Sequence, residues 1–147
     1  MTTHILSLTY APKIPLVKSG ECTQTIRLHN PDRPKKVGDK LILHTWAGRS
    51  YFSKWDWRLE TKISEVILLD WGRSIEDAQT SIHNGEFWES YEPVSLAQLA
   101  EIARLDGIKP YWMELAEILM KLNGLKKIEL TEWDIIRWPK STIRRVE

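Results

Sequence analysis

Alternating patterns and hydrophobic runs predict five strands along the chain, four of them short and one long. The clearest alternation covers residues 40–45, where Leu41 and Leu43 lie on one face and Ile42 and His44 on the other. Shorter or more hydrophobic runs predict the remaining strands, at residues 5–8, 23–27, 57–69 and 133–138. The chain is therefore expected to be rich in β-structure.

Helical spacing and capping residues predict three helices. The first covers residues 12–18 and is expected to end at Gly20, a residue suited to the left-handed conformation. Ser95 and Gln98 form a capping box for a second helix that ends near Asp106. The third starts at residue 110 and ends near Gly124. Together these elements predict an α+β fold, a small and mostly antiparallel β-barrel with short flanking helices.

Composition and charge indicate a single domain. The chain has 147 residues, 42% of them hydrophobic and 28% charged, as is typical of a globular protein. It lacks a run apolar enough for a membrane span, a secretory signal and a cysteine pair, because Cys22 is the single cysteine. We therefore expect a cytoplasmic protein with no membrane partner. Cations prevail over residues 1–58 and 120–147, which end in a basic tail at 141–147, whereas acids prevail over residues 59–119. The cationic segments could together form a phosphate-attracting face, or they could pair with the acidic segment.

Residues 23–27 carry the first candidate chemistry. Thr23, Thr25 and Arg27 share one face of the predicted strand, because side chains alternate. Two hydroxyls and a guanidinium form a donor-rich wall that suits an oxygen-rich, planar ligand. The alternative is an ordinary edge strand with a solvated arginine.

Aromatic and basic residues alternate in the predicted loop at 47–56. Arg49, Lys54 and Trp55 are candidates for a mouth that binds phosphates and stacks on bases. The alternative is that these aromatic residues fold back and close one end of a barrel. Most of the eight tryptophans are expected in the core, and one or two are candidates for stacking.

Four motifs resemble those of the ASCH domain family (activating signal cointegrator homology), which belongs to the PUA-like superfamily. They are SG-x-x-TQTIR at 19–27, KVGDKL at 36–41, ARLDGI at 103–108 with EL at 114–115, and WDIIRW at 133–138. The resemblance spans about residues 5–138 and implies a PUA-like barrel. Residues 71–93 have no counterpart in it and are interpreted as an insertion. Within it, residues 74–91 are predicted to be a loop that can include a short helix or strand.

The resemblance also implies an activity. Some members of the family hydrolyse the amide of acetylated cytidine with a lysine, a threonine and a glutamate. The threonine corresponds to Thr25, the lysine to Cys22 and the acid to Asp106. Lys18 or Arg27 could activate a thiolate at Cys22, whereas the alternative is a small, partly buried cysteine without reactivity. No metal or cofactor is expected, because the sequence contains neither metal-ligand motifs nor a glycine-rich phosphate loop.

The leading hypothesis is a binding module for nucleic acid or a modified nucleotide, with RNA as the first candidate partner. The ligand would lie in a cleft between the first helix and the barrel. The predicted ligand contacts are Thr23, Arg27, Lys18, Arg49, Lys54 and Trp55, with Thr25, Asp106 and Cys22 catalytic if the protein is an enzyme. One alternative is an amidohydrolase or nuclease at the same cleft, and another is a regulatory domain that binds a protein through the acidic segment at 76–92.

Overall fold

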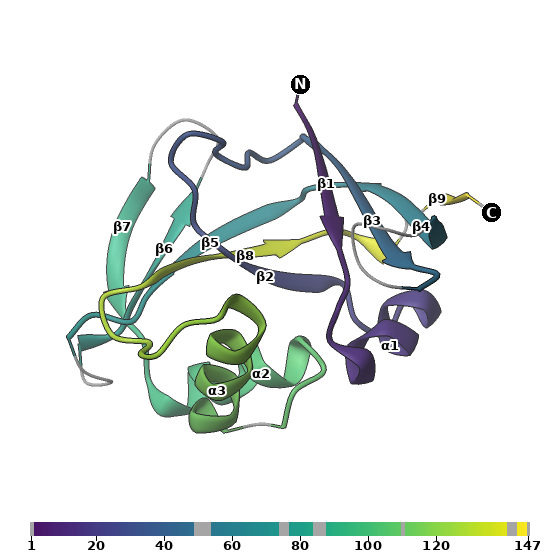
Figure 1. Ribbon diagram of the computed structural model, residues 1–147. Coiled ribbons are helices and arrows are strands. Elements are labelled where there is room, and N and C mark those ends of the chain that lie inside the picture. Colours follow the sequence, from purple (N-terminus) through teal and green to yellow (C-terminus); the bar gives the residue numbers. More distant parts are fainter. Residues whose placement is uncertain are drawn as a thin grey trace.

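Two β-sheets form the body of the protein, and the helices lie beneath them (Figure 1). The computed structural model describes residues 2–48, 54–73, 77–83, 88–109, 111–140 and 144–146. In these residues three α-helices accompany one four-stranded and one five-stranded sheet, which confirms the predicted α+β class.

The first sheet has the strand order β1-β3-β4-β9. Its strands are β1 (Thr3–Ser7), β3 (Lys40–Trp46), β4 (Trp55–Lys62) and β9 (Arg144–Val146). Strand β1 runs parallel to β3, and the other two pairings are antiparallel. The prediction of a mere basic tail at 141–147 was wrong for residues 144–146, because their backbone pairs with the edge of β4 whatever the charge of the side chains.

The second sheet has the order β2-β8-β5-β6-β7. Its strands are β2 (Gln24–Leu28), β8 (Glu132–Arg137), β5 (Glu65–Asp70), β6 (Gln79–His83) and β7 (Trp88–Pro93), with antiparallel pairing throughout. The single long strand predicted at 57–69 was wrong. The chain leaves the first sheet at Lys62 and enters the second at Glu65, a change that a continuous hydrophobic run does not reveal.

The segment at 71–93 contributes strands to this sheet. Strands β6 and β7 extend it beyond β5, and the predicted insertion therefore includes strand structure at the sheet edge. The acidic segment at 76–92 lies mainly in these two strands, with residues 76 and 84–87 outside the described part of the chain.

The three α-helices end where the local signals predict, and α2 also begins at its predicted cap. A 3₁₀ turn, η1 (Ala11–Lys13), leads into α1 (Ile14–Ser19), which ends at Gly20 with φ 82°. Helix α2 (Leu96–Leu105) has the capping box, and α3 (Trp112–Asn123) ends at Gly124 with φ 64°. Tyr111 precedes α3, and the predicted start at residue 110 lies outside the described residues.

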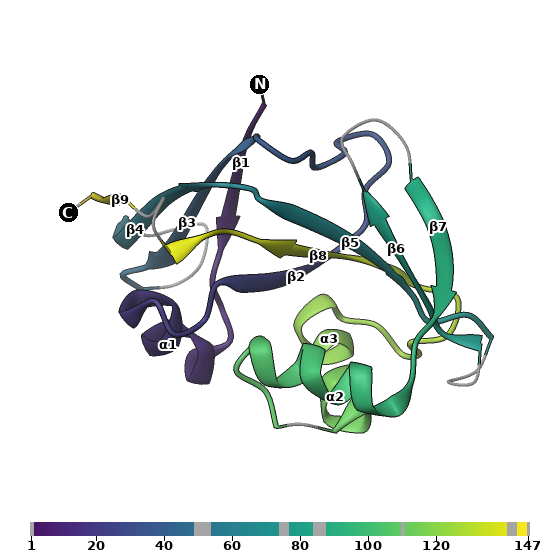
Figure 2. The same cartoon turned by 180° about the vertical axis from the view of Figure 1, so that it is seen from behind.

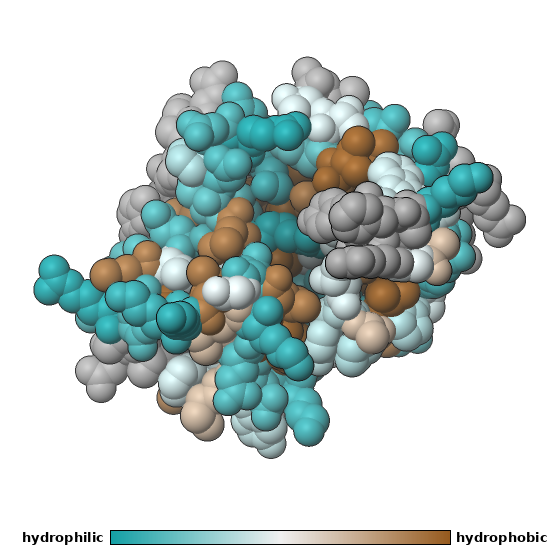
Figure 3. Space-filling view, in the orientation of Figure 1, coloured by the Kyte–Doolittle hydropathy of each residue, from teal (hydrophilic) through white to brown (hydrophobic). Residues whose placement is uncertain are grey.

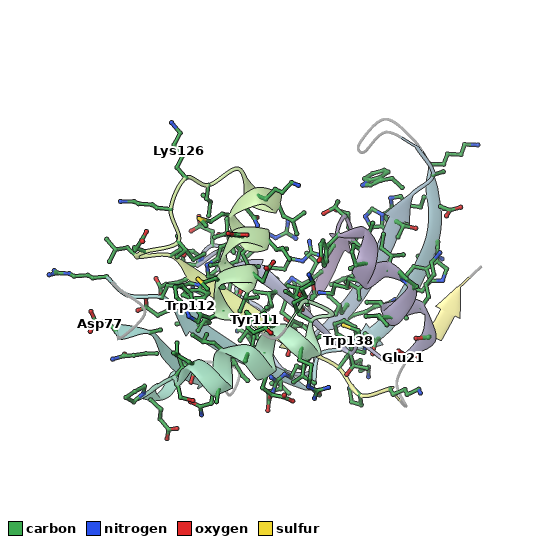
Figure 4. All side chains as sticks on the ribbon, turned by 90° about the horizontal axis from the view of Figure 1, so that it is seen from below. Glu21, Asp77, Tyr111, Trp112, Lys126 and Trp138 are labelled. Atoms are coloured by element: carbon green, nitrogen blue, oxygen red, sulfur yellow. The ribbon has the colours of Figure 1, made fainter. Side chains whose placement is uncertain are left out.

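Two hydrophobic clusters hold the layers together. One lies between the second sheet and helices α2 and α3, and it includes Trp71 and Trp133. The other lies between the two sheets and α1, and it includes Trp138, which Figure 4 shows beside α1. Viewed from behind, α2 and α3 again cover the second sheet, whereas α1 lies under the first (Figure 2). Tryptophan burial therefore follows the expectation at these three positions.

Strands β1 and β2 lie at the edges where the two sheets face each other. Backbone pairing of the described residues does not join them into one closed barrel. Instead, an Arg27 Nη donates to the Ser7 carbonyl over 2.7 Å and bridges the two edges. The barrel in the predicted fold thus stays a prediction, while the layered α+β arrangement is established.

Candidate functional site

A small pocket opens where β2, η1 and α3 meet. Its polar lining includes Lys13, Thr25, Arg27 and Asp106, and hydrophobic residues of α3 complete the wall. The volume of the pocket is about 80 Å³. On the molecular face of Figure 1, hydrophilic residues are recessed between hydrophobic ones (Figure 3). Because pockets for whole drug-sized ligands usually reach about 300 Å³ or more, this one fits a small group or one edge of a ring.

Lys13 and Asp106 form a buried ion pair at the base of the pocket. The ammonium Nζ donates to Asp106 Oδ1 over 2.8 Å, and each side chain is 6% exposed. Burial raises the pKa of the Asp106 carboxyl, and the charge of Lys13 opposes this rise. The pocket therefore holds a carboxylate and an ammonium in contact, although they are 93 residues apart in the chain.

The backbone around Asp106 allows this approach. Gly107, with φ 76°, follows Asp106, and a Cβ at this position would lie 3.0 Å from Leu16 Cδ1. Glycine thus brings the end of α2 against η1 and α1 without a steric clash. The motif that predicted a helix end at 106–107 also positions the acid.

Gln24 also contacts Asp106, from β2. Its Nε2 donates to the Ile102 carbonyl over 3.0 Å and, more weakly, to Asp106 Oδ1 at 3.4 Å. Its Oε1 accepts from Arg137 Nε over 2.9 Å. Both hydrogen bonds that Asp106 accepts from the described side chains therefore go to Oδ1, which leaves Oδ2 for a ligand.

Thr25 and Arg27 lie side by side on β2, on the face predicted for them. Arg27 Nε donates to Thr25 Oγ1 over 3.2 Å. Thr25 is buried, Arg27 is half-buried, and both line the pocket. Of the residues predicted to be catalytic, the structure thus brings Thr25 and Asp106 to one pocket.

Cys22 does not line the pocket. Its thiol packs in the cluster with α1, and Sγ lies within hydrogen-bond distance of the carbonyls of Gln24 and Leu105, at 3.3 and 3.2 Å. Burial raises the pKa of the thiol, which disfavours a thiolate. Its surroundings fit the alternative of a small buried residue better than a nucleophile.

The remaining predicted contacts are dispersed. Lys18 Nζ lies 5.5 Å from the ring centre of Trp57, and Thr23 is half-buried just before β2. Lys54 is exposed, and Trp55 stacks on His44 with ring centres 4.0 Å apart. None of Lys18, Thr23, Lys54 and Trp55 lines the pocket. Arg49 lies outside the described residues.

Sequence reasoning missed Lys13 and Gln24. Lys13 lies in a predicted helix with only a proline before it to mark the helix start, and nothing in the local pattern indicates that its side chain is buried. Gln24 lies on the face of the strand opposite Thr25, by the same alternation of side chains. Asp106 lies close enough to the start of β2 for Gln24 to reach it from that face.

Comparison of the chain with protein-family models, with curated proteins and with solved structures gives no match. Within the described part of the chain, no group of three or more His, Cys, Asp or Glu side chains could hold a metal ion. No helix there has the length and apolar character needed to cross a membrane.

Proposed function

We propose that the protein binds a nucleotide or a short single-stranded RNA segment, and that one base edge enters the pocket between β2, η1 and α3. The observation that carries this proposal is the grouping of Lys13, Thr25, Arg27 and Asp106 in one small pocket. The chain is further proposed to have a PUA-like barrel, on the strength of the four ordered motifs described above.

The polar groups suit the edge of an amino-substituted base. Asp106 Oδ2 accepts from an exocyclic amine, while the Lys13 ammonium and the Thr25 hydroxyl can donate to a neighbouring ring nitrogen or carbonyl. The hydrophobic side chains of Ile118 and Leu122 line the same pocket and can cover a ring face. The limited volume restricts entry to one ring edge.

Binding is tested by calorimetry with cytidine, N4-acetylcytidine and a cytidine-rich RNA oligomer. Thr25→Ala and Asp106→Asn should weaken binding by about tenfold or more, since each removes a hydrogen bond to the ligand. Lys18→Met is the matched control, because Lys18 does not line the pocket. Equal effects of all three substitutions, or no binding by the unmodified protein, would refute the proposal that the ligand binds in this pocket.

RNA binding has a second signature. Affinity for the oligomer should fall steeply with salt, and Lys54→Ala should lower it further without affecting the free nucleosides. A salt-independent affinity would favour recognition of a nucleoside alone.

A second candidate function is hydrolysis of the amide of acetylated cytidine. It is favoured by the Lys13 ammonium, which reaches the pocket although Cys22 occupies the position that the resemblance gives to lysine. In this reaction Asp106 takes a proton from water, the hydroxide adds to the acetyl carbon, and Lys13 and Thr25 stabilise the oxyanion. The bond from carbon to N4 breaks, the proton passes to N4, and acetate and cytidine leave.

Hydrolysis is measured as release of cytidine from N4-acetylcytidine. Lys13→Met and Thr25→Ala should abolish the release, whereas Cys22→Ser should preserve it. Binding of acetylcytidine without release would leave the binding function as the sole candidate for this pocket.

A further inference from the structure

A β-bulge in the first sheet changes which side chain lies on one of its faces. Strands β3 and β4 pair in a regular register up to Thr45 and Trp57. The register then shifts by one residue, so that Trp46 pairs with Trp55 where a regular ladder would place Asp56. The bulge therefore puts an indole, in place of a carboxylate, on the sheet face that Trp46 occupies. Bulges commonly aim a side chain in this way beside a binding site.

The indole of Trp55 is held flat against a buried ring. It stacks on His44 with ring centres 4.0 Å apart and 15° between the ring planes, and Trp46 contacts the same imidazole edge-on at 4.9 Å. His44 is 4% exposed, whereas Trp55 is 37% exposed. Because His44 covers one face of the indole, the exposed surface of Trp55 belongs to its other face and its edges. The structure thus presents a flat aromatic surface in a fixed orientation, which lowers the entropy lost when a second ring stacks on it.

A cation accompanies this surface on the same face of the sheet. Arg58 pairs with His44 across β3 and β4, and directly paired residues of an antiparallel ladder point to the same side. Its side chain is half-buried and makes no hydrogen bond or ion pair with the rest of the described chain. An aromatic face beside an unpaired guanidinium matches the two parts of a nucleotide, a base that stacks and a phosphate that carries charge.

The end of β1 connects this surface to the pocket. Ser7 pairs with His44, and the backbone N–H of Leu8 donates to the His44 carbonyl over 2.8 Å. Leu8 in turn lines the pocket. The aromatic surface and the pocket therefore flank the same stretch of backbone, an arrangement that suits neighbouring nucleotides of one strand.

We propose that Trp55 and Arg58 form a second nucleotide subsite, in which a base stacks on the indole and a phosphate contacts the guanidinium. Stacking accepts any base, since every base has a π-face, whereas the pocket contacts only a base edge. That the ligand is a nucleic acid rests on the proposed function. The subsite shares no side chain with the pocket, so the two can be tested separately.

The stacking contact is tested by calorimetry with cytidine and with the dinucleotides CpA and ApC, which attach an adenine to either side of cytidine. At least one dinucleotide should bind about tenfold more tightly than cytidine. Trp55→Leu keeps an apolar side chain over His44 but removes the flat ring, so it should abolish that difference and leave the affinity for cytidine within about twofold. Tyr111→Leu is the matched control, because Tyr111 is an exposed aromatic residue outside both sites, and it should change neither affinity.

Trp55→Phe separates stacking from a role in folding. Phenylalanine retains a ring that stacks on His44, so this variant should keep most of the preference for the dinucleotide. Circular dichroism checks that both variants fold. If Trp55→Leu folds and weakens cytidine and the dinucleotides alike, Trp55 acts through the fold and the subsite is refuted.

Arg58→Met tests the phosphate contact with a cytidine-rich RNA oligomer. Loss of one phosphate contact should reduce the slope of log affinity against log salt concentration by about 0.7, while the affinity for cytidine is unchanged. Lys62→Met is the control, since it removes the same charge from an exposed residue of the same strand. Equal changes of slope in the two variants would refute the contact with Arg58.

The outcomes distinguish the subsite from the pocket. If cytidine binds but neither dinucleotide binds more tightly, the subsite is refuted and the pocket stands. If a dinucleotide binds through Trp55 while cytidine does not bind and Thr25→Ala has no effect, the pocket fails and the subsite stands. If none of these ligands binds, both are refuted.

Discussion

Replacing Lys13 by methionine removes one half of the buried ion pair and leaves the Asp106 carboxyl in place. Both side chains are 6% exposed, so water cannot easily take over the role of the ammonium. Breaking such a pair typically costs about 3–5 kcal/mol. That is a large part of the roughly 5–15 kcal/mol that stabilises a single domain, and it is readily measured.

Protonation of the Asp106 carboxyl limits the part of this cost that comes from its unpaired charge. The buried carboxyl can take up a proton, and at pH 7 protonation from a reference pKa of 3.8 costs about 4 kcal/mol. At pH 5 the same step costs about 2 kcal/mol. Because burial raises the pKa of Asp106 in the folded state, the folded protein binds the extra proton, and stability falls as the pH rises above 3.8. The loss in Lys13→Met should therefore be smaller at pH 5 than at pH 7.

Urea denaturation at both pH values measures the difference in free energy of unfolding. Lys13→Met/Asp106→Asn should be more stable than Lys13→Met at pH 7 and should lack the pH dependence of this site, since no buried carboxyl remains. Lys36→Met, at an exposed lysine, serves as the control and should change stability by less than about 0.5 kcal/mol. A loss below about 1 kcal/mol in Lys13→Met at pH 7, or one that is equal at pH 5, would refute the buried pair.

Three further outcomes follow from local geometry. In thermal unfolding, Gly107→Ala should destabilise the protein by more than Gly124→Ala. Both glycines have positive φ, but of the two only Gly107 has a neighbouring atom within 4 Å of the position that a Cβ would take. Equal losses of stability would contradict the close approach of Leu16 to Gly107. Burial alone would raise the pKa of Asp39, but hydrogen bonds, that of His4 foremost, outweigh it and lower the pKa. Asp39→Asn should therefore cost about 1–3 kcal/mol at pH 7, and the difference should vanish as the pH falls through the lowered pKa, whereas a constant difference would exclude this linkage. Cys22 should react with a thiol reagent only on unfolding, and rapid labelling of the native protein would show that the thiol is accessible.

The sequence predicted the helix ends, the helix cap and the shared strand face, because each depends on residues that are close together in the chain. The left-handed ends at Gly20 and Gly124 and the capping box at Ser95 depend on residues within one helical turn. The shared face of Thr25 and Arg27 follows from the alternation of a single strand, and their hydrogen bond confirms it. These features position one wall of the pocket.

Pairing between distant segments was not predictable in the same way. Residues 144–146 join the first sheet through backbone hydrogen bonds, which a basic side-chain pattern neither indicates nor excludes. The break between β4 and β5 lies inside a hydrophobic run, because each part is buried in a different sheet. Lys13 meets its acid only after helices and strands have packed, so its role could not be read from its neighbours in the chain.

The side-chain amide of Gln24 lies on a strand that the sequence predicts, but its partners come from distant segments of the chain. Its orientation is determined by Arg137, because a guanidinium only donates and therefore selects Oε1. Nε2 must then face the Ile102 carbonyl and Asp106, where it reinforces the contact that Lys13 makes with Oδ1. Gln24, on the strand face opposite Thr25, thus adds to the contacts on Oδ1 and leaves Oδ2 for a ligand. The chemistry of the pocket depends on β8 and η1 as much as on the motif that first drew attention to β2.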